Sequence, residues 1–106
     1  MRAKVNERTN MSIAESINES HVNSVIAMAI DYATSFMVFR HETSTDIDVF
    51  WMSDRGCESY SIDVMHSGAV LVYDTSKGFD SKACEEYSSY EDAFERLVDI
   101  FTGMDS

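Results

Sequence analysis

The chain is poor in cysteine and glycine. Its two cysteines, Cys57 and Cys84, are widely spaced and form no C-x-x-C pair, which argues against a disulfide framework and against a zinc site. The four glycines are isolated in the sequence, so no glycine-rich loop is present to cradle a phosphate group. We therefore expect no metal, no cofactor and no bound nucleotide.

Long apolar runs are also missing. The longest strongly apolar stretch, residues 25–30, is far shorter than the roughly 20 residues that a membrane-spanning helix needs. No continuous apolar segment follows the basic residues Arg2, Lys4 and Arg8, so a secretory signal is not expected. Together with the few cysteines, this predicts a protein of the reducing cytoplasm.

Basic residues are scarce as well. Eight Lys and Arg side chains oppose 19 Asp and Glu side chains, which gives a formal net charge of −11 at pH 7. Because three of the basic residues lie among residues 1–10, the rest of the chain is more acidic than this total suggests. Such a field repels nucleic acid and anionic membranes and attracts basic protein surfaces. A basic protein is therefore the expected partner, without direct binding of nucleic acid or of a membrane.

A length of 106 residues suits one ordinary domain, and a hydrophobic content of 44% is sufficient for a core. Residues 1–11 are polar and show no hydrophobic period, so we predict a flexible tail there. Residues 12–106 are predicted to form a single acidic α+β domain.

A helix is predicted at the start of this domain. Ser12 and Glu15 have the spacing of a capping box. Apolar residues then recur at intervals of three and four, as on the buried face of a helix. The stripe consists of Ile13, Ile17, His21, Val25, Met28 and Tyr32, widened by Val22, Ile26 and Ala29. Polar residues at 18–20 leave open whether this region is one helix or two.

From residue 35 onward the hydrophobic period falls to two and β-forming residues dominate. Four strands are predicted, at 36–41, 47–53, 58–65 and 69–73. Short turns separate them, so the strands should form an antiparallel meander. The polar segment 74–89 is longer than a connection requires, and we expect it to contribute to function.

A second helix is predicted to close the domain. Ser88 and Glu91 repeat the capping-box spacing, and the helix is expected to end at Gly103. Its apolar stripe consists of Phe94, Leu97, Val98 and Phe101. The predicted fold is therefore α+β: an N-terminal helix, a four-stranded antiparallel β-meander and a C-terminal helix, with both helices on one sheet face.

Alternation along the second and third strands separates two faces of the predicted sheet. The core side is formed by Ile47, Val49, Trp51, Tyr60, Ile62 and Val64. The opposite side mixes carboxylates with Phe50, Met52 and Met65, which indicates an interface. Alternatively, these three apolar side chains lie under residues 74–89 or in a contact between two copies of the chain.

Acidic residues of this opposite side are predicted to form a row. Asp46 and Asp48 are two residues apart on a strand, which separates equivalent atoms by roughly 6.6 Å. Sites for nucleic acid bind phosphates through Lys and Arg, so a row of carboxylates can occupy such a site competitively. The predicted partner-binding residues are Asp46, Asp48, Phe50, Met52, Asp63, Met65, Asp74, Asp80, Glu85 and Glu86. The alternative is an acidic surface that only provides solubility.

These features predict a small acidic inhibitor that blocks a basic nucleic-acid-handling protein, such as a nuclease, as a nucleic-acid mimic. In size, acidity and element order the chain resembles the small acidic inhibitors that phages use against nucleases, including anti-CRISPR proteins, and the immunity proteins of nuclease toxins. The resemblance is one of general style and assigns no site residues. The rival hypothesis is an acidic chaperone or adaptor, active as a homodimer, whose acidity gives only solubility.

Catalysis is not expected, because no candidate group has a supporting pattern. Cys57 with His66 or His41 would need an orienting context that the sequence lacks. Alternation across adjacent strands could also gather His41, His66, Asp46 and Asp63, but such gathering is equally expected without a metal.

Overall fold

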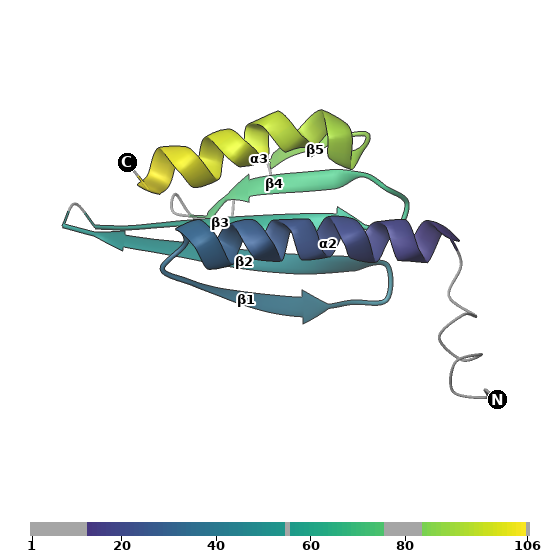
Figure 1. Cartoon of the computed structure of the whole chain (residues 1–106), viewed down its shortest axis with the longest axis horizontal. Helices are drawn as coiled ribbons and strands as arrows, with labels where there is room; N and C mark the ends of the chain where they lie inside the picture. The colour runs from purple at the N-terminus through teal and green to yellow at the C-terminus, as the bar shows by residue number, and fades with distance from the viewer. Residues whose placement is uncertain (1–12, 55, 76–83, 106) are drawn as a thin grey trace.

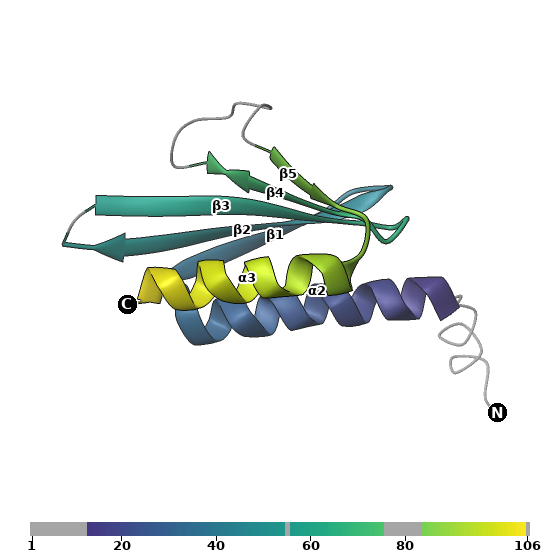
Figure 2. The ribbon, with the colours of Figure 1, turned by 90° about the horizontal axis from the view of Figure 1, so that it is seen from above.

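The computed structural model describes residues 13–54, 56–75 and 84–105 (Figure 1). Its elements are α2 (Ile13–Tyr32), β1 (Ser35–Arg40), β2 (Ser44–Ser53), β3 (Gly56–Met65), β4 (Val70–Asp74), β5 (Cys84–Tyr87) and α3 (Tyr90–Asp105). The strands form one antiparallel sheet in the order β1-β2-β3-β4-β5, and both helices cover the same face of it (Figure 2). The predicted α+β class, meander order and one-sided helix cover are confirmed. The predicted tail and the cap residue Ser12 lie outside the described residues.

α2 is one continuous helix, although polar residues interrupt its apolar pattern. Asn18 is 6% exposed, and its side-chain amide donates a 2.8 Å hydrogen bond to the backbone carbonyl of Met65. Ile17, which the periodic pattern placed in the core, is instead 51% exposed. At this turn of the helix Asn18 rather than Ile17 is buried, because its hydrogen bond to the sheet offsets the cost of burying a polar side chain.

The core lies between the helices and the covered face of the sheet. All six residues predicted for the core side of the second and third strands are buried: Ile47, Val49, Trp51, Tyr60, Ile62 and Val64. Leu97 and Phe101 of α3 and Val25 of α2 complete the same cluster. The alternation of side chains along a strand thus explains this half of the fold.

The sheet has five strands rather than the predicted four. β5 pairs antiparallel with β4 and lies inside the polar segment 74–89, where no strand was predicted. It has four residues, two of which are glutamates, so neither its length nor its composition indicates a strand. The strand conformation of β5 is stabilised by its backbone pairing with β4, which the sequence of β5 alone does not reveal.

α3 begins and ends differently from the prediction. The Asp92 N–H donates to Ser89 Oγ at 3.2 Å, so Ser89 and not Ser88 caps the helix. Ser88 Oγ instead donates to the Asp92 carboxylate at 2.9 Å, and Glu91 lies 3.7 Å from the His21 imidazole of α2. The helix continues past Gly103 to Asp105, because this glycine keeps a helical backbone rather than the left-handed conformation of a C-terminal cap.

Candidate functional site

We call the sheet surface that faces away from α2 and α3 the open face (Figure 2). The register places side chains from all five strands on it. Its described members include Met37, Phe39, Asp46, Asp48, Phe50, Met52, Ser61, Asp63, Met65, Leu71, Tyr73, Cys84 and Glu86. No helix covers this face within residues 13–54, 56–75 and 84–105, so it is the first candidate for partner binding.

Three aspartates meet at the centre of the open face, and we call them the acidic cluster. Asp46 on β2 lies directly opposite Asp63 on β3, and Asp48 lies opposite Ser61. The Ser61 hydroxyl, which is 7% exposed, donates a 2.7 Å hydrogen bond to Asp46 Oδ1. Asp46 and Asp48 are two residues apart on β2, and the register of β2 against β3 adds Asp63 beside them.

The acidic cluster holds its negative charge at a cost. Partial burial raises the pKa of each of Asp46, Asp48 and Asp63, because a low-dielectric environment disfavours the ionised carboxylate. The charge of Asp63 raises the pKa of Asp46 further, while the hydrogen bond from Ser61 acts in the opposite direction. A cationic partner would relieve this cost by supplying the missing opposite charge.

Apolar side chains border the acidic cluster. Met37 lies opposite Asp48 and Phe39 lies opposite Asp46, and they are 50% and 42% exposed. Met52, further along β2, is 70% exposed. Met52 is among the predicted partner-binding residues, whereas the two β1 residues are not, because their place beside the aspartates depends on the pairing of β1 with β2.

The described arginines both lie away from the open face. Arg40 pairs with Glu19 of α2. Arg96 of α3 makes a bidentate contact with Glu85, with nitrogen–oxygen distances of 2.9, 3.2 and 3.0 Å. Within the described part of the chain, the acidic cluster therefore has no arginine or lysine beside it.

The structure divides the predicted partner-binding residues into two groups. Asp46, Asp48, Phe50, Met52, Asp63, Met65 and Glu86 share the open face. Asp74 and Glu85 lie opposite Tyr60 and Val72 and so belong to the helix-covered side, which breaks the predicted row. Asp80 lies outside the described residues.

The Glu85 carboxylate is occupied by contacts within the fold and is not available to a partner. Besides its contact with Arg96, it accepts a 2.6 Å hydrogen bond from the Tyr87 hydroxyl. The hydrogen bonds from Arg96 lower the pKa of Glu85, which is opposite to the shift in the acidic cluster. Glu85 therefore ties β5 to α3 and does not extend the acidic surface.

The candidate catalytic groups are not brought together. Cys57 lies at the start of β3 and His66 follows its far end, so the length of the strand separates them. The His41 N–H donates to Ser44 O, which places His41 near the same far end. Among the described residues, no group of three or more His, Cys, Asp or Glu side chains is arranged to hold a metal ion. Neither of the described helices, α2 and α3, is long and apolar enough to cross a membrane.

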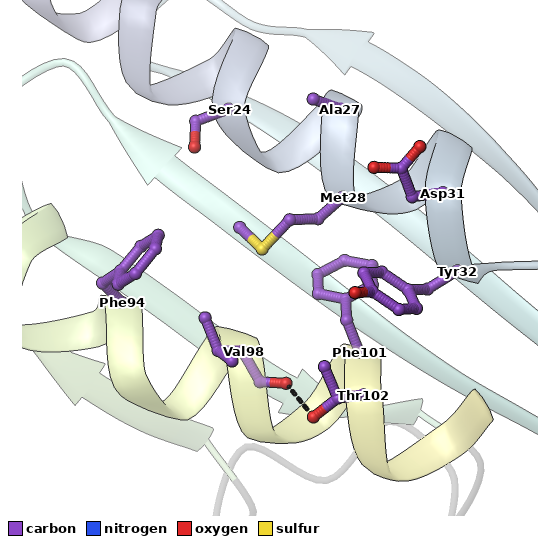
Figure 3. Close-up of a pocket in the computed structure, with 9 residues that line it drawn as sticks. All are labelled: Ser24, Ala27, Met28, Asp31, Tyr32, Phe94, Val98, Phe101 and Thr102. Atoms are coloured by element: carbon purple, nitrogen blue, oxygen red, sulfur yellow. Dashed lines mark hydrogen bonds between the residues drawn. The ribbon is translucent and has the colours of Figure 1, made fainter. Parts of the chain in front are cut away.

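A second surface feature lies between the two helices (Figure 3). A groove of about 290 Å³ separates α2 from α3, and Met28, Tyr32 and Phe101 project into it. Phe94, on the α3 side, is 43% exposed. The groove is mainly apolar, with Asp31 and Thr102 among the residues that line it.

Comparisons of the chain with protein-family models, with curated proteins and with solved structures found no match. The open face and the groove between the helices are therefore the two surfaces whose chemistry bears on function. The open face is the stronger candidate of the two, because partly buried carboxylates and exposed apolar side chains lie together on it.

Proposed function

We propose that this protein is a small acidic inhibitor that binds a basic, nucleic-acid-handling protein and blocks its substrate site. The observation that carries the proposal is the acidic cluster of Asp46, Asp48 and Asp63, bordered by exposed Met37 and Phe39, with exposed Met52 further along β2 on the same face. Its action is steric and electrostatic, and it needs no chemistry of its own.

Electrostatics support this choice of partner. Lys and Arg side chains that normally bind phosphates would instead donate charge-assisted hydrogen bonds to the three carboxylates. Binding would lower the raised pKa values of these aspartates, so protons would be released when the complex forms in mildly acidic solution. Affinity for the partner should accordingly rise with pH in that range and fall with added salt.

Exposed apolar side chains support a protein partner rather than free cations. Methionine adapts its shape to irregular surfaces, and interfaces combine apolar anchors with a polar surround. Met52 and Met37 are at least half exposed and lie on the same face as the carboxylates. A partner that covered them would gain apolar burial together with its ion pairs.

The first test is a pull-down from lysate with the tagged full chain, washed at low and at high salt, followed by identification of the retained proteins. The proposal expects a nucleic-acid-binding protein that is lost at high salt. Its affinity for the purified inhibitor is then measured by calorimetry, with and without competing nucleic acid. Simultaneous binding of nucleic acid and inhibitor at undiminished affinity would contradict the blocking mechanism.

Matched variants locate the interface. Replacing Asp46→Asn together with Asp48→Asn removes two charges from the open face, while Asp31→Asn together with Asp99→Asn removes two from the exposed helix surfaces. The first pair should weaken binding by about a hundredfold or more, because charge pairs at a buried interface contribute on the order of 1.5 kcal/mol or more each. Equal losses in both pairs would show that net charge alone determines binding.

A second function, an acidic chaperone or adaptor, is favoured by one observation: the apolar groove lined by Met28, Tyr32, Phe94 and Phe101. Such a protein would hold an apolar client segment, and binding would persist at high salt. Phe94→Gln should then abolish client binding, whereas the Asp46→Asn and Asp48→Asn pair should leave it unchanged. The opposite pattern is expected for the inhibitor.

A further inference from the structure

The two edges of the sheet are protected very differently. β5 has only four residues and carries Glu85 and Glu86, and short charged edge strands resist pairing with other chains. β1 has six residues, with neither proline nor glycine, and includes exposed Met37 and Phe39 (Figure 1). An edge strand with exposed apolar side chains and no proline is a template for pairing with another strand.

Backbone groups of β1 are available on its outer side. The His41 N–H donates to Ser44 O across the turn to β2. Because hydrogen-bonded and non-hydrogen-bonded pairs alternate in an antiparallel ladder, the amides and carbonyls of Phe36, Val38 and Arg40 point away from β2. No described strand pairs with this side, since β1 ends the sheet.

We propose that two copies of this chain pair antiparallel through β1, about a two-fold axis at Val38. Val38 then lies opposite Val38 of the second copy, and its outward amide and carbonyl exchange hydrogen bonds with their counterparts. Phe36 and Arg40 lie opposite each other on either side of the axis and add further bonds. On the open face, Phe39 of each copy lies opposite Met37 of the other, so exposed apolar area is buried.

A second copy suits this edge better than any other part of the described sheet. β1 is the strand without Asp or Glu, whereas β2, β3, β4 and β5 each carry at least one. Two chains of net charge −11 repel each other, and pairing through β1 keeps the carboxylates of the sheet away from the contact. A two-fold axis also makes the contact self-complementary, as isologous dimers require.

The dimer would form one continuous sheet with both open faces on the same side. Asp46 and Asp48 of the two copies would lie on β2 strands about 14 Å apart, three inter-strand spacings. This inference does not rest on the proposed inhibitor function, since it depends on backbone pairing and not on a basic partner.

The test is the mass of the full chain, kept reduced so that exposed Cys57 cannot cross-link, by sedimentation equilibrium over a range of concentrations. The expected result is a monomer–dimer equilibrium whose dissociation constant falls as salt is added, because screening weakens the repulsion between acidic copies. The salt response is thus opposite to that expected for the basic partner, which separates failure of one proposal from failure of the other. A monomer at all concentrations would overturn the inference.

Two matched variants and one measurement on the unaltered chain locate the contact. Phe39→Lys places a charge at the edge and should raise the dissociation constant by about tenfold or more, as edge lysines do. Met52→Lys makes the same change of charge on the same face away from the edge, and should leave the constant unchanged. A dimer that survives Phe39→Lys, with the fold checked by circular dichroism, would overturn the β1 contact.

Amide exchange provides the measurement that needs no variant. In the dimer the outward amides of Phe36, Val38 and Arg40 are hydrogen-bonded, so their exchange should slow as protein concentration rises. Amides of β5 in the same samples serve as the internal reference. Dimerisation without slower exchange at β1 would place the contact elsewhere and contradict the proposal.

Discussion

The two faces of the sheet treat charge in opposite ways. On the covered side, Arg96 binds Glu85 and Arg40 binds Glu19, so each described arginine has a carboxylate partner. On the open face, Asp46 accepts a hydrogen bond from the Ser61 hydroxyl, and the neighbouring charge of Asp63 raises the pKa of Asp46. Proximity to a cation lowers the pKa of Glu85, whereas burial raises the pKa of the three aspartates.

This contrast separates what stabilises the fold from what is available for binding. Paired charges and apolar packing on the covered side contribute to the free energy of unfolding. The acidic cluster subtracts from it at neutral pH, because partial burial disfavours its ionised carboxylates. The predictions below challenge this division, from the largest effect to the smallest.

The largest effect is expected in the core. Ile62 is fully buried at the centre of β3, and Ile62→Ala should lower the free energy of unfolding by about 2–5 kcal/mol through lost burial and the remaining cavity. The control, Met52→Ala on the open face, should change it by less than about 0.5 kcal/mol. Urea denaturation measures both, and similar losses would refute the division between the faces.

A smaller loss is expected where helix and sheet are joined by a buried polar contact. Asn18→Ala removes the bond to Met65 O and leaves that carbonyl without this donor, at a cost of about 1–2 kcal/mol. Ser20→Ala, on an exposed position of the same helix, is the control and should cost nothing measurable. Equal thermal stability of the two variants would argue against a structural role for Asn18.

Charge removal should have opposite signs on the two faces. Arg96→Met breaks the contact with Glu85 and should lower the free energy of unfolding by about 0.5–1 kcal/mol, since the pair is partly exposed. Asp46→Asn keeps an acceptor for the Ser61 hydroxyl but removes a penalised charge, so it should raise the free energy of unfolding at pH 7. A loss of stability in Asp46→Asn would contradict this account.

The dependence of stability on pH gives the finest distinction. A raised pKa means that the contribution of the acidic cluster is complete below the ordinary Asp value of 3.8 and is lost as pH rises through the folded-state pKa values. A lowered pKa means that Glu85 contributes above its ordinary value of 4.5 and loses this contribution as pH falls through its folded-state pKa.

Melting temperatures between pH 3 and pH 7 check both directions. Relative to a variant with Asn at 46, 48 and 63, the unaltered protein should lose stability as pH rises above about 4. Relative to Glu85→Gln, it should lose stability as pH falls below about 4.5. Two parallel curves would show that the opposite pKa shifts have no thermodynamic effect.

Most of the fold could be predicted because its signals are local. Alternation in β2 and β3 separated Ile47 and Ile62 from Asp46 and Asp63 without reference to any other strand. β5 could not be predicted, because its two glutamates are favourable only once Arg96 binds one of them. The predicted cap of α3 was wrong by one residue, because Ser88 and Ser89 are adjacent and only the folded backbone selects between them.

The candidate site was predicted in part for the same reason. Asp46, Asp48 and Asp63 could be assigned to one face, whereas Asp74 and Glu85 were placed in the same row because the register of β4 and β5 was unknown. A shift of one residue turns a side chain to the other face of a sheet. Met37 and Phe39 needed only the pairing of β1 with β2 to be recognised as neighbours of the aspartates.

By itself, the sequence determined the acidic excess, the order of helices and strands, and the division of the central strands into an apolar and a mixed side. These properties follow from composition and from periods of two and of three to four residues. Only the tertiary structure decided which carboxylates meet, which of them an arginine neutralises, and which strand is left at an unprotected edge. Each of these depends on contacts between residues far apart in the chain, and such contacts are set by register and packing rather than by local pattern.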